Sequence, residues 1–117
     1  MSCYFQVDDE VLWNPSNMVG EFFKGQADAF ALTVNLPAGI GPLEDDEYRI
    51  DMPVFAACVD ELALIYANAS HQVLRSLLQG FLATAVVLVR RGGGRLRCIS
   101  GDVLDLSSEQ EAWMPRD

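Results

Sequence analysis

The sequence predicts an α+β fold in which three helices pack on a small, mostly antiparallel sheet. Three observations lead to this prediction. Aromatic and β-branched residues flank a short acidic turn near the N-terminus, apolar residues recur at three- and four-residue steps over three long segments, and a polar–apolar alternation follows near the C-terminus. The 117 residues correspond to one domain, 1–117, with residues 110–117 as a frayed tail. The alternative is a helical bundle with irregular ends.

The first element is a β-hairpin over residues 4–13, in which Asp8-Asp9 forms the turn. Asn14 then caps a helix and Pro15 takes its first position, with Ser16 as the alternative cap. This helix runs over residues 15–34. Its apolar stripe consists of Val19, Phe22, Phe23, Ala27, Phe30, Ala31 and Val34.

Two glycines, Gly20 and Gly25, lie inside this first helix. Each weakens a helix by up to about 1 kcal/mol relative to alanine. Either packing within the chain compensates, or another backbone approaches closely there.

The rest of the chain contains two further helices and short strands. Two prolines, two glycines and four acids predict a loop over residues 36–47. Asp51 is expected to cap the helix that begins at residue 52. In order, the expected elements are a strand at 48–50, helices at 52–68 and 71–91, strands at 95–99 and 103–106, and a helical turn from Ser107 or Ser108 to Trp113. The stripe of the 71–91 helix includes Val73, Leu74, Leu77 and Leu78, and its second half is apolar almost all round, so it is predicted to be the most buried element.

The charge balance narrows the classes of partner. The formal net charge is −9, from 17 acids against 8 basic residues. Binding to nucleic acid or to an anionic membrane depends on lysine and arginine, so neither is expected. A basic protein partner, or solubility alone, fits this balance. Residues 71–101 contain five arginines and no acid, which predicts ion pairs between this segment and the acidic parts of the chain. The alternative is a polarised surface that docks a charged partner.

No catalytic, metal or cofactor motif is recognisable, so the chain is more consistent with a non-enzymatic protein. The single histidine, His71, lies at a predicted helix start, and no cysteine–histidine spacing of a zinc site occurs. Three scattered cysteines, Cys3, Cys58 and Cys98, indicate reduced thiols and a cytoplasmic protein. The apolar window 77–89 is too short to span a bilayer.

The leading hypothesis for function is an acidic protein-interaction module: an inhibitor, an immunity-type protein or an accessory subunit. Its expected contact residues are Asp8, Asp9, Glu44, Asp45, Asp46, Glu47 and Trp13. Trp13 has a second interpretation, in which it covers the edge of the core.

The alternative is a small-molecule binder, or a modest enzyme, with a pocket between the helices and the sheet. Tyr4, Tyr48, Tyr66, Arg90 and Arg91 would line that pocket. With either function, the apolar 71–91 helix leaves a homodimer open.

Four strings carry a family resemblance: Tyr4-Phe5-Gln6-Val7, Trp13-Asn14-Pro15-Ser16-Asn17, Ile50-Asp51-Met52-Pro53-Val54-Phe55 and Leu78-Gln79-Gly80-Phe81-Leu82-Ala83-Thr84. Over residues 4–91 the sequence resembles a family of small uncharacterised actinobacterial proteins with no assigned activity. The resemblance implies a bacterial cytosolic origin and no mechanism.

Overall fold

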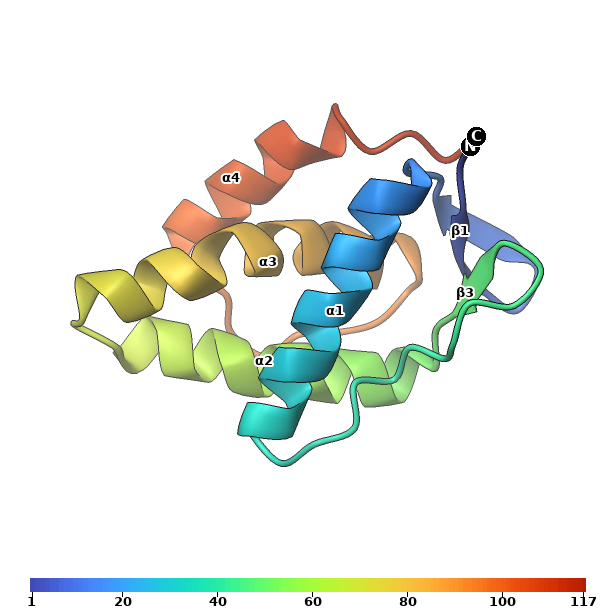
Figure 1. Cartoon of the computed structure of the whole chain (residues 1–117). Helices are drawn as coiled ribbons and strands as arrows, with labels where there is room; N and C mark the ends of the chain where they lie inside the picture. Colours follow the sequence, from blue (N-terminus) through green and yellow to red (C-terminus); the bar gives the residue numbers. More distant parts are fainter.

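Four helices and a three-stranded sheet make up the fold, as seen in a computed structural model that describes residues 1–117 (Figure 1). The α+β prediction is confirmed. The elements in chain order are β1 (Tyr4–Val7), β2 (Glu10–Trp13), α1 (Asn17–Thr33), β3 (Glu47–Arg49), α2 (Met52–Asn68), α3 (Gln72–Arg91) and α4 (Gly101–Glu111).

The sheet has the order β2-β1-β3, and its third strand comes from the middle of the chain. β1 and β2 form the predicted antiparallel hairpin, whereas β3 pairs with β1 in parallel. The expectation of a mostly antiparallel sheet completed by a C-terminal strand is therefore wrong. The chain after α1 returns along the sheet, and Tyr4 donates a hydrogen bond to the carbonyl of Asp46, which brings β3 beside β1.

The two strands expected at 95–99 and 103–106 do not form. Residues 95–99 lie in an irregular loop, and Val103 belongs to α4. Val103 and Ser107, four residues apart, are the buried residues of that helix, so the segment follows a helical and not an extended pattern. Helix α4 packs against α3 and therefore adds a fourth helix to the predicted three.

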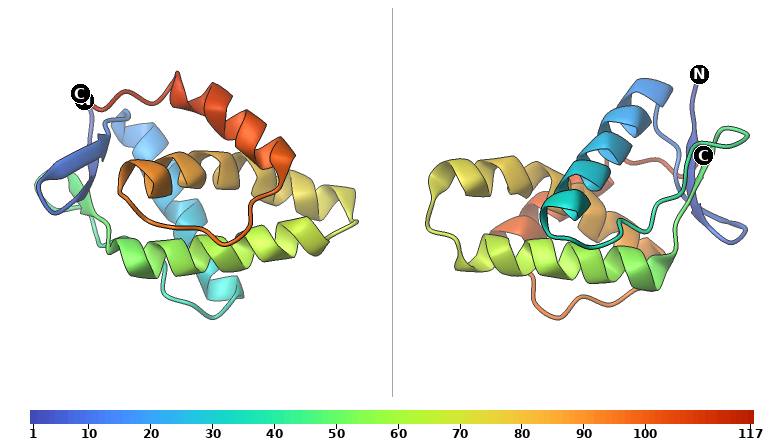
Figure 2. Two further views of the ribbon diagram at one scale, coloured as in Figure 1. Left: turned by 180° about the vertical axis from the view of Figure 1, so that it is seen from behind. Right: turned by 60° about the horizontal axis from the view of Figure 1, so that its bottom comes forward.

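Helix α3 forms the centre of the molecule. α2 and α4 lie on its two sides, and α1 crosses in front of it (Figures 1 and 2). The buried residues of α3 begin at Leu78 and include every residue from Ala85 to Val89, which confirms its predicted place in the core. By length and composition α3 would also suffice to cross a membrane, but half of its most apolar window is buried inside the protein, as in a core helix.

The first turns of α3 depart from the predicted stripe. Val73 is 60% exposed and Leu77 61% exposed, because these turns project beyond the elements that cover the second half of the helix. The predicted core stripe therefore holds only from Leu78 onward.

The helix starts follow local capping chemistry. Ser16, the alternative cap, accepts a hydrogen bond from the Val19 amide, so the assignment of Asn14 as the cap is wrong. At α3 the cap is His71, whose Nδ1 accepts from the Leu74 amide at 3.4 Å. Asp51 precedes Met52 as predicted, although its side chain makes no capping hydrogen bond.

An aromatic cluster joins the sheet to the helices. Phe5 of β1 stacks on Trp13 and Tyr48 with ring centroids 5.2 and 4.7 Å apart. Phe23 of α1 meets the rings of Phe5 and Trp13 edge-on and stacks on Phe81 of α3 with ring centroids 5.1 Å apart. This cluster fixes which side of α1 faces the core.

The C-terminal tail lies against the body of the protein. Met114 is 3% exposed, and the Pro115 carbonyl accepts a hydrogen bond from the Asn14 amide at 2.7 Å. The tail therefore holds Trp113 in a defined place beside α1, although fraying was expected from the sequence.

Candidate interaction surface

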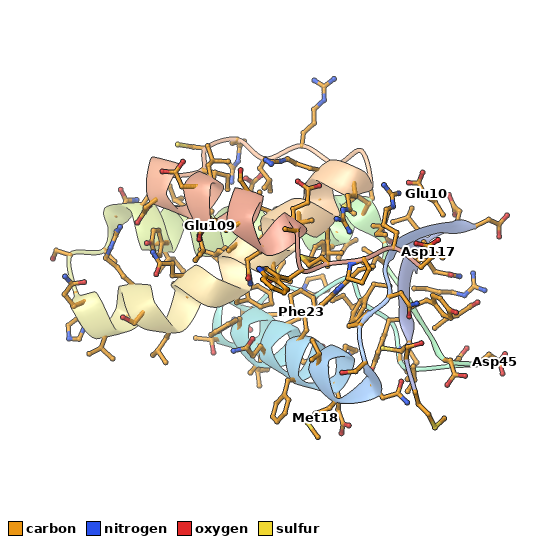
Figure 3. The ribbon with its side chains drawn as sticks, turned by 90° about the horizontal axis from the view of Figure 1, so that it is seen from above. Glu10, Met18, Phe23, Asp45, Glu109 and Asp117 are labelled. Atoms are coloured by element: carbon orange, nitrogen blue, oxygen red, sulfur yellow. The ribbon has the colours of Figure 1, made fainter.

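The acidic residues predicted to contact a partner lie on two separate loops. Asp8 and Asp9 form the β1–β2 turn, whereas Glu44, Asp45 and Asp46 form the turn before β3; these five residues are all exposed. β1 and β3 are parallel and pair Tyr4 with Glu47, so the two loops lie at opposite ends of the sheet. In Figure 3, Asp45 lies at an extremity of the molecule.

Trp13, the seventh predicted contact residue, belongs to the core. It is 5% exposed and lies opposite Phe5 in the hairpin, with its ring against Phe23. The structure therefore agrees with its second interpretation, in which Trp13 covers the edge of the core. The exposed tryptophan is Trp113, at 82%.

The five residues expected to line a ligand pocket do not converge. Tyr48 is buried on Phe5, and Tyr66 is 2% exposed at the far end of α2. Arg91 donates to the backbone carbonyls of Leu12 and Met114, both at 2.7 Å, and so ties the hairpin to the tail. Arg90 is exposed at the end of α3 and Tyr4 is half-buried on β1. These residues stabilise different contacts and form no common site.

The most connected polar cluster joins three helices through Tyr66. Its hydroxyl donates to Asp102 Oδ2 at 2.5 Å and accepts from Gln79 at 3.2 Å. The Arg75 guanidinium lies 4.0 Å from the Tyr66 ring centre and contacts Asp102 at 3.2 Å. Arg75 also donates to the carbonyls of Tyr66 and Ala69 at the C-terminal end of α2.

The electrostatics of this cluster indicate a structural role. Hydrogen bonds from Ser100 and then Tyr66 lower the pKa of Asp102 to about 2. Burial, followed by the hydrogen bond to Asp102, raises the pKa of Tyr66. The cluster thus pairs a carboxylate with a neutral phenol that is too deeply buried to meet a substrate, and it anchors the start of α4. Sequence reasoning did not connect Asp102 and Arg75 to Tyr66, because the contact depends on how three helices pack.

Other reactive groups give no site. Burial raises the pKa of the Cys58 thiol, which is a core side chain. No three histidine, cysteine or acidic side chains are arranged to hold a metal ion.

The outer side of α1 carries an exposed apolar surface. We call it the α1 outer face and define it by Met18, Val19, Phe22, Gly25, Ala29 and Leu32. Phe22 is 71% exposed and Leu32 80% exposed. Figure 3 shows Met18 pointing away from the body, on the side of α1 opposite to Phe23. The predicted core stripe includes Val19 and Phe22, and for these two residues the prediction is wrong, since Phe23, Ala27 and Ala31 face the core.

Two depressions shape this surface. One is a shallow hollow over the middle of α1, lined only by α1 residues, among them Phe22, Gly25 and Ala29. The other, of about 340 Å³, lies between α1, α3 and the tail, where Val19 and Phe22 line it together with Trp113. The α1 outer face therefore continues across a recess to the exposed indole.

The two sides of the α1 outer face differ in charge. Glu21 borders the first depression, and Asp28 lines a neighbouring groove of about 770 Å³ that Asp8 and Asp51 also line. Toward α4 the border is uncharged, with Gln26, Thr84 and Gln110. The only basic residue in the acidic groove is Arg49.

Comparison with known proteins gives a family and no function. No curated protein and no solved structure matches the chain. A match to the description "Family of unknown function (DUF6086)" extends over residues 1–116. Because this match covers nearly the whole chain, the protein belongs to the family of unknown function DUF6086.

Proposed function

We propose that this protein is a non-enzymatic interaction module that binds another protein through the α1 outer face. The observation that carries the proposal is the exposure of large apolar side chains along α1, Phe22 and Leu32, together with an exposed Trp113 that lines one recess with Phe22. Contiguous exposed apolar surface is a mark of protein–protein contact. Aromatic residues are over-represented among those that dominate binding energy.

The composition of the surface also favours a basic partner. Acids border the α1 outer face on the side of Glu21 and Asp28, and the whole chain carries a net charge of −9. Complementary charge speeds encounter and excludes wrong partners. We place this partner and the protein in the bacterial cytoplasm, which the family resemblance and the unpaired cysteines support. Accessory subunit, immunity-type protein and inhibitor are the roles that agree with such binding.

The test is affinity capture with matched variants of the full chain. Tagged wild type, Phe22→Ser and Leu64→Ser are used at low and at high salt, followed by quantitative mass spectrometry. Leu64 is the control because it is an exposed leucine of α2, at 45%, outside the proposed surface. We expect one near-stoichiometric protein with wild type and Leu64→Ser, and about tenfold less with Phe22→Ser. Equal recovery by all three, or no specific protein, would contradict the proposal.

A further inference from the structure

We infer that the α1 outer face receives an α-helix of the partner, packed lengthwise along α1 with its basic edge over Glu21 and Asp28. This inference rests on the proposed function, since it names the shape and charge of what the surface binds. Spacing, close approach and charge each contribute to it.

The spacing along α1 is that of a helix-packing seam. Met18, Phe22, Gly25, Ala29 and Leu32 follow one another at steps of four, three, four and three residues. This alternation places apolar side chains in a line that another helix can follow. The line extends for about 21 Å along the helix axis, which corresponds to about four turns of a partner helix. The residues that face the core, such as Phe23 and Ala27, belong to the opposite side.

Gly25 supports close approach by another backbone. A Cβ atom at this position would meet nothing within 4 Å, so the packing of this chain gives no reason for glycine. At Gly20, by contrast, a Cβ atom would collide with Cys3 Sγ, and the fold itself requires glycine. Glycine in a helix costs up to about 1 kcal/mol relative to alanine. A partner helix lying in the depression over Gly25 and Ala29 accounts for this cost, because small residues allow two helix axes to come close.

The charges decide what kind of helix fits. The Glu21 carboxylate makes no hydrogen bond or ion pair, and the Asp28 carboxylate is paired only with Lys24. Beyond Asp28 the neighbouring groove is lined by Asp8 and Asp51, against one basic residue, Arg49. Opposite charges at the edges of packed helices select the partner and its orientation. Lysine or arginine along one edge of the partner helix, facing Glu21 and Asp28, satisfies this border.

A second copy of this chain fits the surface less well. The seam would pair with itself in antiparallel fashion about Gly25, and Met18 would then meet Leu32 of the copy. The same symmetry would place the edge with Glu21 and Asp28 beside its own copy, and like charges in such positions destabilise pairing. The net charge of −9 on each chain adds to the repulsion. A basic partner of different sequence avoids both effects.

Three synthetic helical peptides of 21 residues test the inference. They share a leucine and alanine seam of four-three spacing and carry lysine, glutamine or glutamate at the edge positions. Calorimetry gives affinities for wild type and for Glu21→Lys/Asp28→Lys, and NMR of the labelled protein locates the contact. The control Asp105→Lys/Glu109→Lys changes net charge equally on α4, where both residues are exposed and Glu109 points away from α1 (Figure 3). Thermal unfolding checks that each variant is folded.

The expected result is that wild type binds the lysine peptide about tenfold or more tightly than the glutamate peptide, with spectral changes concentrated on α1. The preference should reverse in Glu21→Lys/Asp28→Lys and persist in the control. An unreversed preference, or no binding of any peptide to wild type, would overturn the inference. A dimer in sedimentation that Phe22→Ser abolishes would also overturn it, in favour of a second copy. If affinity capture still depends on Phe22 while the peptides fail, the proposed function stands and only the helical partner is wrong.

Discussion

At the scale of single residues, one glycine within a helix is required by the packing of this chain, and two others are not. Gly20 is required by Cys3, whereas Gly25 and Gly80 have open space where a Cβ atom would lie. Gly25 and Gly80 therefore reduce helix stability, and no packing contact within the chain compensates for that cost. Gly25 lies on the α1 outer face, and Gly80 lies on α3 outside it.

Replacing Gly25 by alanine should raise stability and weaken binding together. We expect the free energy of unfolding to rise by about 0.5 to 1 kcal/mol in Gly25→Ala, because alanine favours the helix and meets no clash. The added methyl group should lower affinity for the captured protein about tenfold, since it fills a close contact. Gly80→Ala should give the same gain in stability with unchanged affinity. Urea unfolding measures the stability and calorimetry measures the affinity. If Gly25→Ala binds the captured protein as tightly as wild type does, the partner does not approach closely at this position.

Much of the candidate surface could be recognised from residue patterns, although its exposure could not. The cost of Gly25 and the apolar spacing of α1 are visible in the sequence. However, this helix has apolar residues on two sides, and periodicity alone does not say which side is covered. Periodicity therefore places Val19 and Phe22 in the core, whereas the aromatic stack of Phe23 on Phe81 turns them outward.

At the scale of elements, helices with strong local signals were predicted closely, and segments defined by tertiary contacts were not. The bounds of α2 match the prediction because Asp51, Pro53 and a full apolar stripe act within one segment. Residues 95–99 alternate as a strand would, but Leu96 and Ile99 line a recess with Val86 and Val89 of α3. Their alternation reflects a loop lying across helices, which local sequence does not distinguish from an edge strand.

The attachment of α4 depends on Asp102, and its stability contribution should vary with pH. The folded-state pKa of about 2 lies below the ordinary value of 3.8, so the carboxylate stabilises the fold above about pH 4 and loses this effect as the pH falls through 2. Because 46% of the side chain is exposed, solvent screening leaves about 1 kcal/mol of this stabilisation. Asp102→Asn should lower the free energy of unfolding by that amount at pH 7 and hardly at all at pH 2.

Urea unfolding of wild type, Asp102→Asn and Asp105→Asn between pH 2 and pH 7 measures this dependence. Asp105 is an exposed acid of the same helix that forms no ion pair, so its variant should follow the wild-type curve. A constant difference between Asp102→Asn and wild type across this range would show that ionisation of Asp102 does not stabilise the fold.

At the scale of the whole molecule, most basic residues form ion pairs within the chain, whereas most acids do not. Six of the 8 basic residues form ion pairs with acids of the same chain, among them Arg75, Arg91 and Arg97 from the segment predicted to pair internally. These pairs engage six of the 17 acids, so eleven carboxylates have no such partner. The surface field is therefore negative, and it should act on the rate of encounter with a basic partner.

The loop before β3 should contribute to this encounter although it lies away from the α1 outer face. We expect Glu44→Gln/Asp45→Asn/Asp46→Asn to slow association with the captured protein about two- to fivefold at low salt and to flatten its salt dependence. The dissociation rate should stay unchanged, because these charges make no contact in the docked complex. Asparagine suits positions 45 and 46, where φ is 52° and 63°, and Glu47 is kept because it pairs with Arg49.

Surface plasmon resonance measures the association and dissociation rates separately, and Asp105→Asn/Glu109→Gln/Asp117→Asn removes three acids elsewhere as the control. A loop variant that associates no more slowly than this control would remove the loop from the steering surface, whereas faster dissociation would place it in the interface itself.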